Sequence, residues 1–248
     1  MSYYTRRPDP NFPPVVKNII IISSLMLLMT WVLAGSFGVD LTRYLALYFP
    51  ASEYFNPYQF VTHLFMHGGI MHLFFNMFAL WMFGRVLENV WGSKRFFIFY
   101  FVTGIGAAGI YTLVHWFEYM ALTTHISPDD VQLVLAKGGA ILSNYRNFTD
   151  PYMAKLNLLV NTPVVGASGA VFGVLLAFGM LFPNTQLMLL FPPIPIKAKY
   201  FVIGYGAIEL YLAFAQPGSN VAHVAHLGGM LFGYFMVKYW NKDRTYFY

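Results

Sequence analysis

The sequence predicts an all-α membrane protein built as a six-transmembrane-helix bundle, and three observations support this fold class. Of the 248 residues, 58% are hydrophobic and only 10% are charged. Several apolar runs of about 17 to 25 residues are each long enough to cross a hydrocarbon core about 30 Å thick. One long polar loop interrupts these runs, which leaves room for one helical bundle and for no separate soluble domain. We therefore expect residues 1–248 to form a single membrane domain.

The apolar runs place six transmembrane spans along the chain. They cover residues 16–36, 69–91, 95–117, 163–182, 199–215 and 221–240. The first run resembles a signal peptide, because a basic segment precedes it and small residues follow it. However, residues 18–34 exceed the usual apolar length of about 7 to 15 residues, which favours an uncleaved helix.

Basic residues predict the orientation of these spans. Eleven of the fifteen Lys and Arg residues lie at the start of the first span or before it, around the turn between the second and third spans, around the turn between the fourth and fifth spans, or at the end of the chain. Because Lys and Arg accumulate on the cytoplasmic side, we expect both termini to be cytoplasmic, with residues 1–15 as a cytoplasmic tail. We expect an integral, multi-pass protein of a bacterial-type cytoplasmic (inner) membrane.

Composition also excludes several kinds of chemistry and partner. The chain has no cysteine, which excludes disulfides, thiolate metal sites and a cysteine nucleophile. Its net charge of +5 is weak support for nucleic-acid binding, because basic residues in a membrane protein chiefly set orientation. We expect a lipid bilayer around the protein and no nucleic-acid partner.

Four polar residues fall at one depth in the predicted bundle. His72 and Asn76 lie early in the second span, Ser168 early in the fourth and His226 early in the sixth. All three spans enter from the outer face, so each residue lies within roughly 5 to 12 Å of the outer end of its helix. Polar groups in a membrane usually face the bundle interior or a water-filled cavity. This layer is therefore a candidate site.

Pairs of glycines predict close contact between the fourth and sixth spans. Gly169 and Gly173 are four residues apart, and Gly229 and Gly233 repeat that spacing. Small residues at this spacing let helix backbones approach, which would bring a short serine side chain within reach of a histidine. The alternative is that Ser168 is only another small interface residue.

Three motifs, in order and on alternate spans, resemble the rhomboid family of intramembrane serine proteases. They are the segment His63–Asn76, the run Gly166-Ala167-Ser168-Gly169, and Ala225-His226-Leu227-Gly228-Gly229 followed by Gly233. Glu88 and Gly92 are also similar to the family pattern. The resemblance covers nearly all of the chain after its first span.

The resemblance implies peptide-bond hydrolysis in or next to the transmembrane segments of substrate proteins. Ser168 would be the nucleophile and His226 the general base of a dyad without an acidic member, the imidazole being held by packing against Phe172. His72 and Asn76 would stabilise the oxyanion with the backbone N–H of Ser168. No cofactor is required. Pro163 predicts the start of the fourth helix, which would place Ser168 near the positive end of a macrodipole.

Other functions remain as alternatives to proteolysis. A rhomboid-like protein could bind membrane helices without cutting them, although such a binder needs neither Ser168 nor His226. A transporter is a weaker alternative, because the polar layer contains no obvious carboxylate relay. The substrate, the cleavage position and the oligomeric state stay open.

The remaining histidines have competing interpretations. His223 could replace His226 as the base, but it lies nearer the outer surface and outside the matching motif. His63, His67 and His72 suggest a metal site, yet no His-Glu-x-x-His motif accompanies them. We interpret His63 and His67 as structural or loop-bonding residues and expect no metal.

Two segments outside the spans carry further expectations. Residues 37–68 are rich in aromatics, which prefer the membrane interface. The resemblance implies that this segment is a partly embedded outer loop. Here Tyr58-Gln59 replaces the Trp-Arg of many family members, which removes the usual guanidinium anchor. Residues 118–161 form a long outer loop, in which Ser127 and Pro128 predict the start of a short amphipathic helix.

Overall fold

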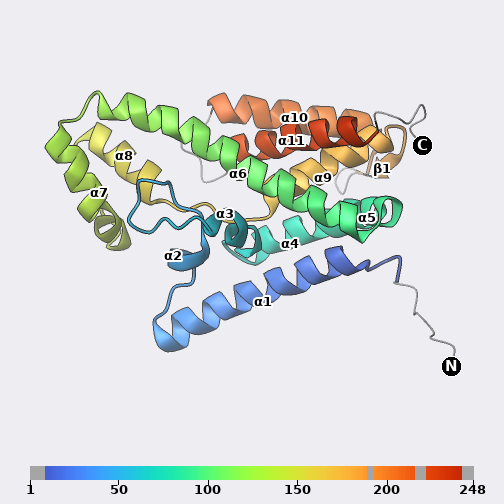
Figure 1. Ribbon diagram of the computed structural model, residues 1–248, viewed down its shortest axis with the longest axis horizontal. Coiled ribbons are helices and arrows are strands. Elements are labelled where there is room, and N and C mark those ends of the chain that lie inside the picture. The colour runs from blue at the N-terminus through green and yellow to red at the C-terminus, as the bar shows by residue number, and fades with distance from the viewer. Residues whose placement is uncertain (1–8, 189–192, 216–221, 242–248) are drawn as a thin grey trace.

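A computed structural model describes residues 9–188, 193–215 and 222–241, and nearly all of its regular structure is helical (Figure 1). The main elements are α1 (Pro14–Phe37), α2 (Thr42–Leu45), α3 (Gln59–Thr62), η1 (His63–Phe65), α4 (Ile70–Ala79), η2 (Leu80–Gly84), α5 (Arg85–Trp91), α6 (Ser93–Thr123), α7 (Pro128–Ser143), α8 (Pro151–Asn161), α9 (Ser168–Leu181), α10 (Ala198–Ala215) and α11 (His223–Trp240). A two-stranded antiparallel hairpin, β1 (Gln186–Met188) and β2 (Pro195–Lys197), precedes α10. The prediction of an all-α chain is confirmed, with this hairpin as a small addition.

Three helices of the described residues are long and apolar enough to cross a membrane. They are α1, the continuous stretch Ile70–Trp91 formed by α4, η2 and α5, and α6. Each coincides with one of the first three predicted spans, although α6 continues six residues beyond the predicted end. Helices α9, α10 and α11 occupy the other three predicted spans. The count of six crossings and the orientation stay predictions.

The bundle is built around α9, which packs against α6 and α11 while α10 covers α9 and α11 (Figure 1). Helix α4 lies on another side of α9, and α1 runs along the edge of the bundle beside α4. The main core lies between α4, η2, α5, α6 and α9, where Phe96, Phe99 and Tyr100 are fully buried. This arrangement surrounds α9, so the start of that helix lies inside the protein.

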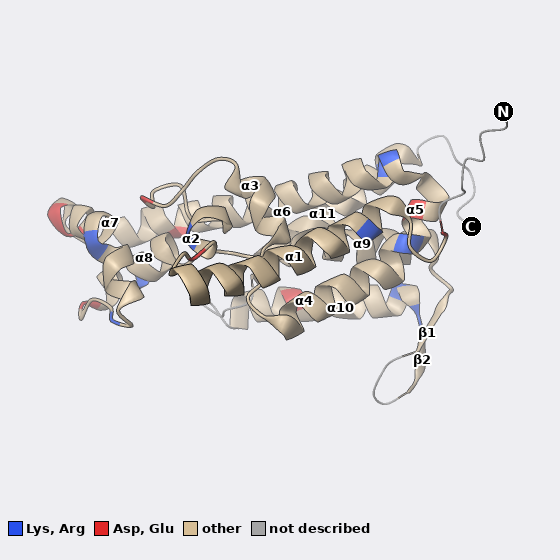
Figure 2. Cartoon of the chain, turned by 90° about the horizontal axis from the view of Figure 1, so that it is seen from below, with Lys and Arg blue, Asp and Glu red and all other residues tan. Residues whose placement is uncertain are grey.

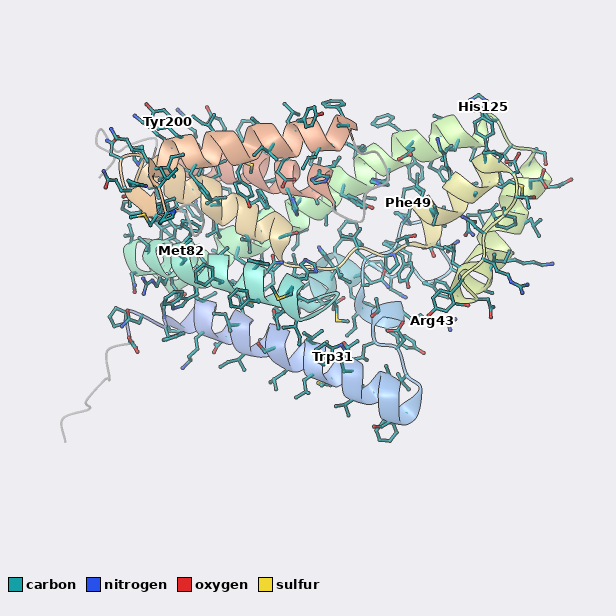
Figure 3. All side chains as sticks on the ribbon, turned by 180° about the vertical axis from the view of Figure 1, so that it is seen from behind. Trp31, Arg43, Phe49, Met82, His125 and Tyr200 are labelled. Carbon is teal, nitrogen blue, oxygen red and sulfur yellow. The ribbon has the colours of Figure 1, made fainter. Side chains whose placement is uncertain are left out.

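Large apolar side chains cover the outside of the bundle. Trp31 on α1, Phe117 on α6 and Tyr211 on α10 are among those that the fold leaves exposed. An exposed apolar surface of this extent is unfavourable in water and favourable in a hydrocarbon. Figure 3 shows side chains projecting outward along α1, with Trp31 among them. The surface therefore fits a lipid surrounding.

The two ends of the bundle differ in charge. Figure 2 shows Lys and Arg concentrated at the end that carries α5 and the β1–β2 hairpin, whereas the acidic residues of α7 mark the other end. The described start of α1 also lies at the basic end, because the indole N–H of Trp81 donates to the carbonyl of Asn11. Trp240, at the end of α11, packs on Trp91 there. Both ends of the described chain thus lie at the same, basic end of the bundle.

Glu88 ties the start of α1 to α5 at the basic end. Its two carboxylate oxygens accept the backbone N–H groups of Val15 and Val16 at 2.9 Å each. The hydroxyl of Ser93 donates to the same carboxylate at 2.6 Å. Glu88 is only 2% exposed, and its charge satisfies orphan donors at the positive end of the α1 dipole.

The predicted outer loop 118–161 contains more helix than the sequence predicts. Helix α7 begins after Ser127, whose hydroxyl accepts the N–H of Asp130, so the predicted cap and helix start are confirmed. Helix α8 was not predicted, and it begins after Asp150, whose carboxylate accepts two backbone N–H groups. The two helices pack together around a second core that includes Val134 and Leu156. Figure 3 shows Phe49 and His125 at this end of the molecule and Tyr200 at the other.

Gln59 anchors the aromatic loop between α1 and α4. It is fully buried, and its amide N–H groups donate to the carbonyls of Tyr44 at 3.1 Å and Tyr54 at 2.8 Å. Its carbonyl accepts the backbone N–H of Tyr48 at 3.2 Å. The sequence left open how the loop is anchored without the guanidinium, and in the structure one neutral amide bonds to three points of the loop.

Replacement of Gln59 by leucine should destabilise this loop. The apolar side chain leaves one buried N–H and two carbonyls without their present partners, at a cost of roughly 1 to 3 kcal/mol for each buried group left unpaired. We expect a lower midpoint of thermal unfolding and faster proteolytic nicking between α1 and α4. Replacing Tyr58, which is 48% exposed, by phenylalanine is the matched control. Equal midpoints for the two variants would contradict the anchor.

Candidate active site

Ser168 is the first residue of α9, which differs from the predicted start at Pro163. The chain before it stays extended because Val164 pairs with Leu47 in an isolated antiparallel bridge. Gly166 then adopts a φ of +123°, a conformation that favours glycine, and donates its N–H to the carbonyl of His63. The helix can begin only after this turn. Ser168 is therefore even closer to the positive end of the macrodipole than the sequence predicts.

His226 lies in the first turn of α11 and contacts Ser168 directly. Its Nε2 lies 2.8 Å from the Oγ of Ser168. The ring of Phe172, one turn after Ser168, stacks on the imidazole with centroids 4.2 Å apart and planes 9° from parallel. His226 is 7% exposed, so the surrounding protein confines its ring. The two polar residues that the sequence placed at one depth thus meet, and the predicted stacking of Phe172 is confirmed.

The glycines of α9 and α11 bring these helices together as predicted. A Cβ atom at Gly229 would overlap the carbonyl oxygen of Gly169, and one at Gly233 would lie 3.1 Å from the Cα of Gly173. Helix α6 also packs against this contact, since a Cβ at Gly169 would lie 2.6 Å from the side chain of Ala107. The backbone contact allows the short Ser168 side chain to reach His226.

A carboxylate that the sequence interpretation missed completes the cluster. The Oε2 of Glu209, on α10, lies 2.9 Å from the Nδ1 of His226 and 2.7 Å from the Nδ1 of His223. All three residues are buried. The expectations of a layer without a carboxylate and of an imidazole held by packing alone are therefore wrong. The missed signal was an acidic residue inside the predicted span 199–215, since an intramembrane carboxylate marks a functional site by default.

A family model, the Rhomboid domain, matches residues 54–242 of this chain. The chain belongs to the rhomboid family. It is 29% identical over 184 residues to Rhomboid protein 1, mitochondrial, of Saccharomyces cerevisiae, covering 73% of this chain and 42% of that protein. It is 28% identical over 178 residues to Rhomboid protease GluP of Bacillus subtilis, covering 72% of this chain and 25% of GluP. It is 31% identical over 172 residues to RHOMBOID-like protein 12, mitochondrial, of Arabidopsis thaliana, covering 68% of this chain and 42% of that protein.

These comparisons place the site inside the region shared with the rhomboid family. The matched segment begins within the loop before α3 and ends after α11, so it contains Ser168, His226 and Glu209, while α1 lies outside it. The chain spans between a quarter and about two fifths of the length of these relatives. As a rhomboid protein with apolar helices, it is a multi-pass membrane protein.

The two residues expected to stabilise an oxyanion occupy one face of α4. The ring of His72 lies against the turn before α9, because a Cβ at Gly166 would lie 2.8 Å from its Nε2. The side-chain amide of Asn76 donates to the carbonyl of His72 at 2.9 Å, and Asn76 is buried. Within the described ranges, no hydrogen bond joins Asn76 to Ser168. In this rhomboid protein, His72 therefore lies against the turn that precedes Ser168. The side chain of Asn76 bonds within its own helix.

His63 and His67 have local structural contacts. The Nδ1 of His63 lies 2.8 Å from the carbonyl oxygen of Gln59, and burial lowers the pKa of this histidine to about 4. His67 is 5% exposed, and its Nδ1 lies 3.3 Å from the carbonyl oxygen of Phe65. These contacts fit the interpretation of both rings as loop-bonding groups. The described part of the chain instead gathers possible metal ligands at Glu209, His223 and His226, within 4.8 Å of one another.

A small cavity lies beside Ser168. Its lining includes Tyr111 of α6, Val165 of the extended segment and Ala222 before α11. Its volume of about 10 Å³ is close to the space that one water molecule needs. The space beside the hydroxyl group is therefore at the lower limit for a single solvent molecule.

Proposed function

We propose that this chain is an intramembrane serine protease that hydrolyses peptide bonds in or next to transmembrane segments of membrane proteins. The observation that carries the proposal is the 2.8 Å contact between the Oγ of Ser168 and the Nε2 of His226 inside an apolar bundle. Membership of the rhomboid family and the similarity to a named rhomboid protease support the same reaction class.

In the proposed first step, the hydroxyl of Ser168 attacks the scissile carbonyl carbon while Nε2 of His226 accepts its proton. The resulting tetrahedral intermediate carries an oxyanion. His226 then gives the proton to the leaving amine, and the C–N bond breaks to form an acyl-enzyme. A water molecule then attacks the ester carbonyl while Nε2 of His226 accepts its proton. The proton passes to the Oγ of Ser168 as the C–O bond breaks, which releases the carboxylic acid product and the free enzyme.

The proposed oxyanion donors are His72, Asn76 and the backbone N–H of Ser168. The ring of His72 lies against Gly166, next to the reacting residue, and Ser168 opens α9, so its N–H has no partner within the helix. One such donor is worth about 2.7 to 4 kcal/mol of barrier in a water-excluded site. In this proposal, the side chain of Asn76 turns toward the oxyanion when a substrate is bound.

The proposed substrates are transmembrane helices that unwind easily. A regular helix buries each carbonyl in an intrahelical hydrogen bond, so Ser168 can attack only where that bond is broken. Small or helix-breaking residues near the cut lower the cost of breaking it. The proposal also keeps both termini in the cytoplasm and a bacterial-type inner membrane. The charge distribution of this chain supports the orientation. The relatives' printed names and organisms point to mitochondria, a chloroplast and a bacterium.

The test is cleavage of defined single-span proteins in proteoliposomes. One substrate carries a Gly-Ala pair near the outer end of its span, and its matched control carries leucines at these two positions. We expect cleavage of the first substrate at least tenfold faster, at a bond inside or beside the span that mass spectrometry locates. Co-purification of intact substrate without any cleavage product would instead favour the binding protein that does not cut.

A further inference from the structure

The buried cluster of Glu209, His223 and His226 contains a carboxylate that the proposed Ser–His reaction does not use. Glu209 comes from α10, whereas both histidines come from the first turn of α11. One oxygen of Glu209 contacts the Nδ1 atoms of both rings, at 2.7 Å and 2.9 Å. Each side chain is less than 10% exposed. A buried charge is costly unless it is paired and hydrogen-bonded, and these contacts meet that requirement.

The contacts determine where the protons lie. An ionised carboxylate only accepts hydrogen bonds, so each Nδ1 that contacts Glu209 must carry a hydrogen. A neutral His226 with a hydrogen on Nδ1 has an unprotonated Nε2, and this is the atom that lies 2.8 Å from the Oγ of Ser168. The carboxylate therefore selects the tautomer in which His226 accepts a proton from Ser168.

We propose that Glu209 is a positioning residue that extends the dyad to a Ser168–His226–Glu209 triad. This inference rests on the proposed function. As the proton leaves Ser168 for Nε2, His226 becomes an imidazolium, and the adjacent carboxylate stabilises its positive charge without accepting a proton. When the imidazolium returns the proton to the leaving amine, Glu209 keeps the ring in place for the second half of the reaction.

His223 supports the carboxylate from its other side. It contacts the same Oε2 atom, and its ring centroid lies 6.2 Å from that of His226 at an interplanar angle of 89°. No hydrogen bond to Ser168 is formed by His223 among the described residues. Its donation fixes the oxygen that faces His226, so His223 holds Glu209 and does not compete as a base.

A positioning role and a purely structural role of Glu209 predict different behaviour of its variants. Removing one member of a buried hydrogen-bonded cluster destabilises the fold, because the remaining polar groups are left without a partner. A structural role therefore predicts that activity follows stability in the variants of Glu209. A positioning role predicts that kcat per folded molecule falls by more than the loss of stability explains.

The experiment compares Glu209→Gln and Glu209→Leu with the wild type in proteoliposomes, using the single-span substrate with the Gly-Ala pair. For Glu209→Leu we expect kcat to fall between about 10² and 10⁴ fold, the upper value being the order found when a carboxylate that orients a catalytic histidine is lost. KM should stay within threefold. The thermal midpoint should fall, because two buried Nδ1–H groups lose their acceptor, so kcat is expressed per folded molecule. Glu209→Gln should lose a comparable amount, because the amide removes the charge and can donate to Nδ1, which favours the wrong tautomer of His226.

Glu88→Gln is the matched control, since Glu88 is also a buried glutamate with hydrogen bonds but lies at the basic end of the bundle. It should lower the thermal midpoint and leave kcat per folded molecule unchanged. Spectra of 15N-labelled histidine add a readout that does not depend on turnover. They should show the Nδ1–H tautomer for His226 in the wild type and its loss in Glu209→Leu.

Two results have different meanings. An active wild type together with a Glu209→Leu variant that keeps its kcat and its tautomer would overturn the triad and leave the Ser–His protease standing. A folded wild type that neither cleaves substrate nor reacts with an active-site probe would overturn the proposed function itself. The histidine spectra would then report only a structural carboxylate.

Discussion

Ser168→Ala is expected to abolish substrate turnover and labelling by a fluorophosphonate probe while the protein stays folded. The variant lacks the only oxygen in contact with Nε2 of His226 among the described side chains. Loss of a nucleophilic serine lowers kcat by roughly 10⁶ fold in a serine protease. Alanine is the best helix former, and residue 168 begins α9, so the local fold should persist.

The measurement is probe labelling of purified wild type and variants, first in detergent and then in lipid, with thermal unfolding as the check on folding. His226→Ala should also label poorly, because Ser168 loses its base. Ser24→Ala is the control, since the hydroxyl of Ser24 only bonds the carbonyl of Ile20 on the exposed surface of α1. Labelling of Ser168→Ala at the wild-type rate would exclude Ser168 as the nucleophile.

The second large effect is expected from Gly229→Ala, although this residue carries no reactive group. The new methyl group would overlap the carbonyl oxygen of Gly169, and backbone atoms cannot turn away as a side chain can. Helices α9 and α11 must therefore separate, which moves His226 away from Ser168. A misplacement of about 1 Å can cost 100-fold in rate. We expect at least this loss in kcat, together with a lower midpoint of thermal unfolding.

Gly109→Ala provides the matched control for this variant. Gly109 also lies in a membrane-spanning helix, but a Cβ atom there meets nothing within 4 Å. Its kcat and thermal midpoint should stay at wild-type values or rise slightly, because alanine favours the helix. If Gly229→Ala behaved like Gly109→Ala, the tight contact between α9 and α11 would not set the site geometry.

The sequence predicted the parts of this structure that have short-range signals. Apolar length found the first three spans, and the four-residue glycine spacing found the contact between α9 and α11. The motif spacing and the family resemblance together predicted that Ser168, His226 and Phe172 lie side by side, as they do in the structure. These predictions worked because helical periodicity and small-residue packing are local properties.

The sequence could not predict features that depend on the partner of a residue. Pro163 signals a helix start, but the pairing of Val164 with Leu47, more than a hundred residues away, keeps that segment extended. Glu209 is separated from His226 by 17 residues and lies on another helix. Gln59 gives no sign in the sequence that it has three backbone partners.

The uncharged nature of the Gln59 anchor has a consequence for the membrane environment. Salt and anionic head groups weaken ionic contacts by screening them and by competing for the charged groups. The amide of Gln59 is neutral and fully buried, so neither effect acts on it. The three hydrogen bonds of Gln59 should therefore persist when ionic strength or lipid charge changes. The charged contact of the loop, Arg43 over the ring of Tyr54 at 4.5 Å, is the part that salt should weaken.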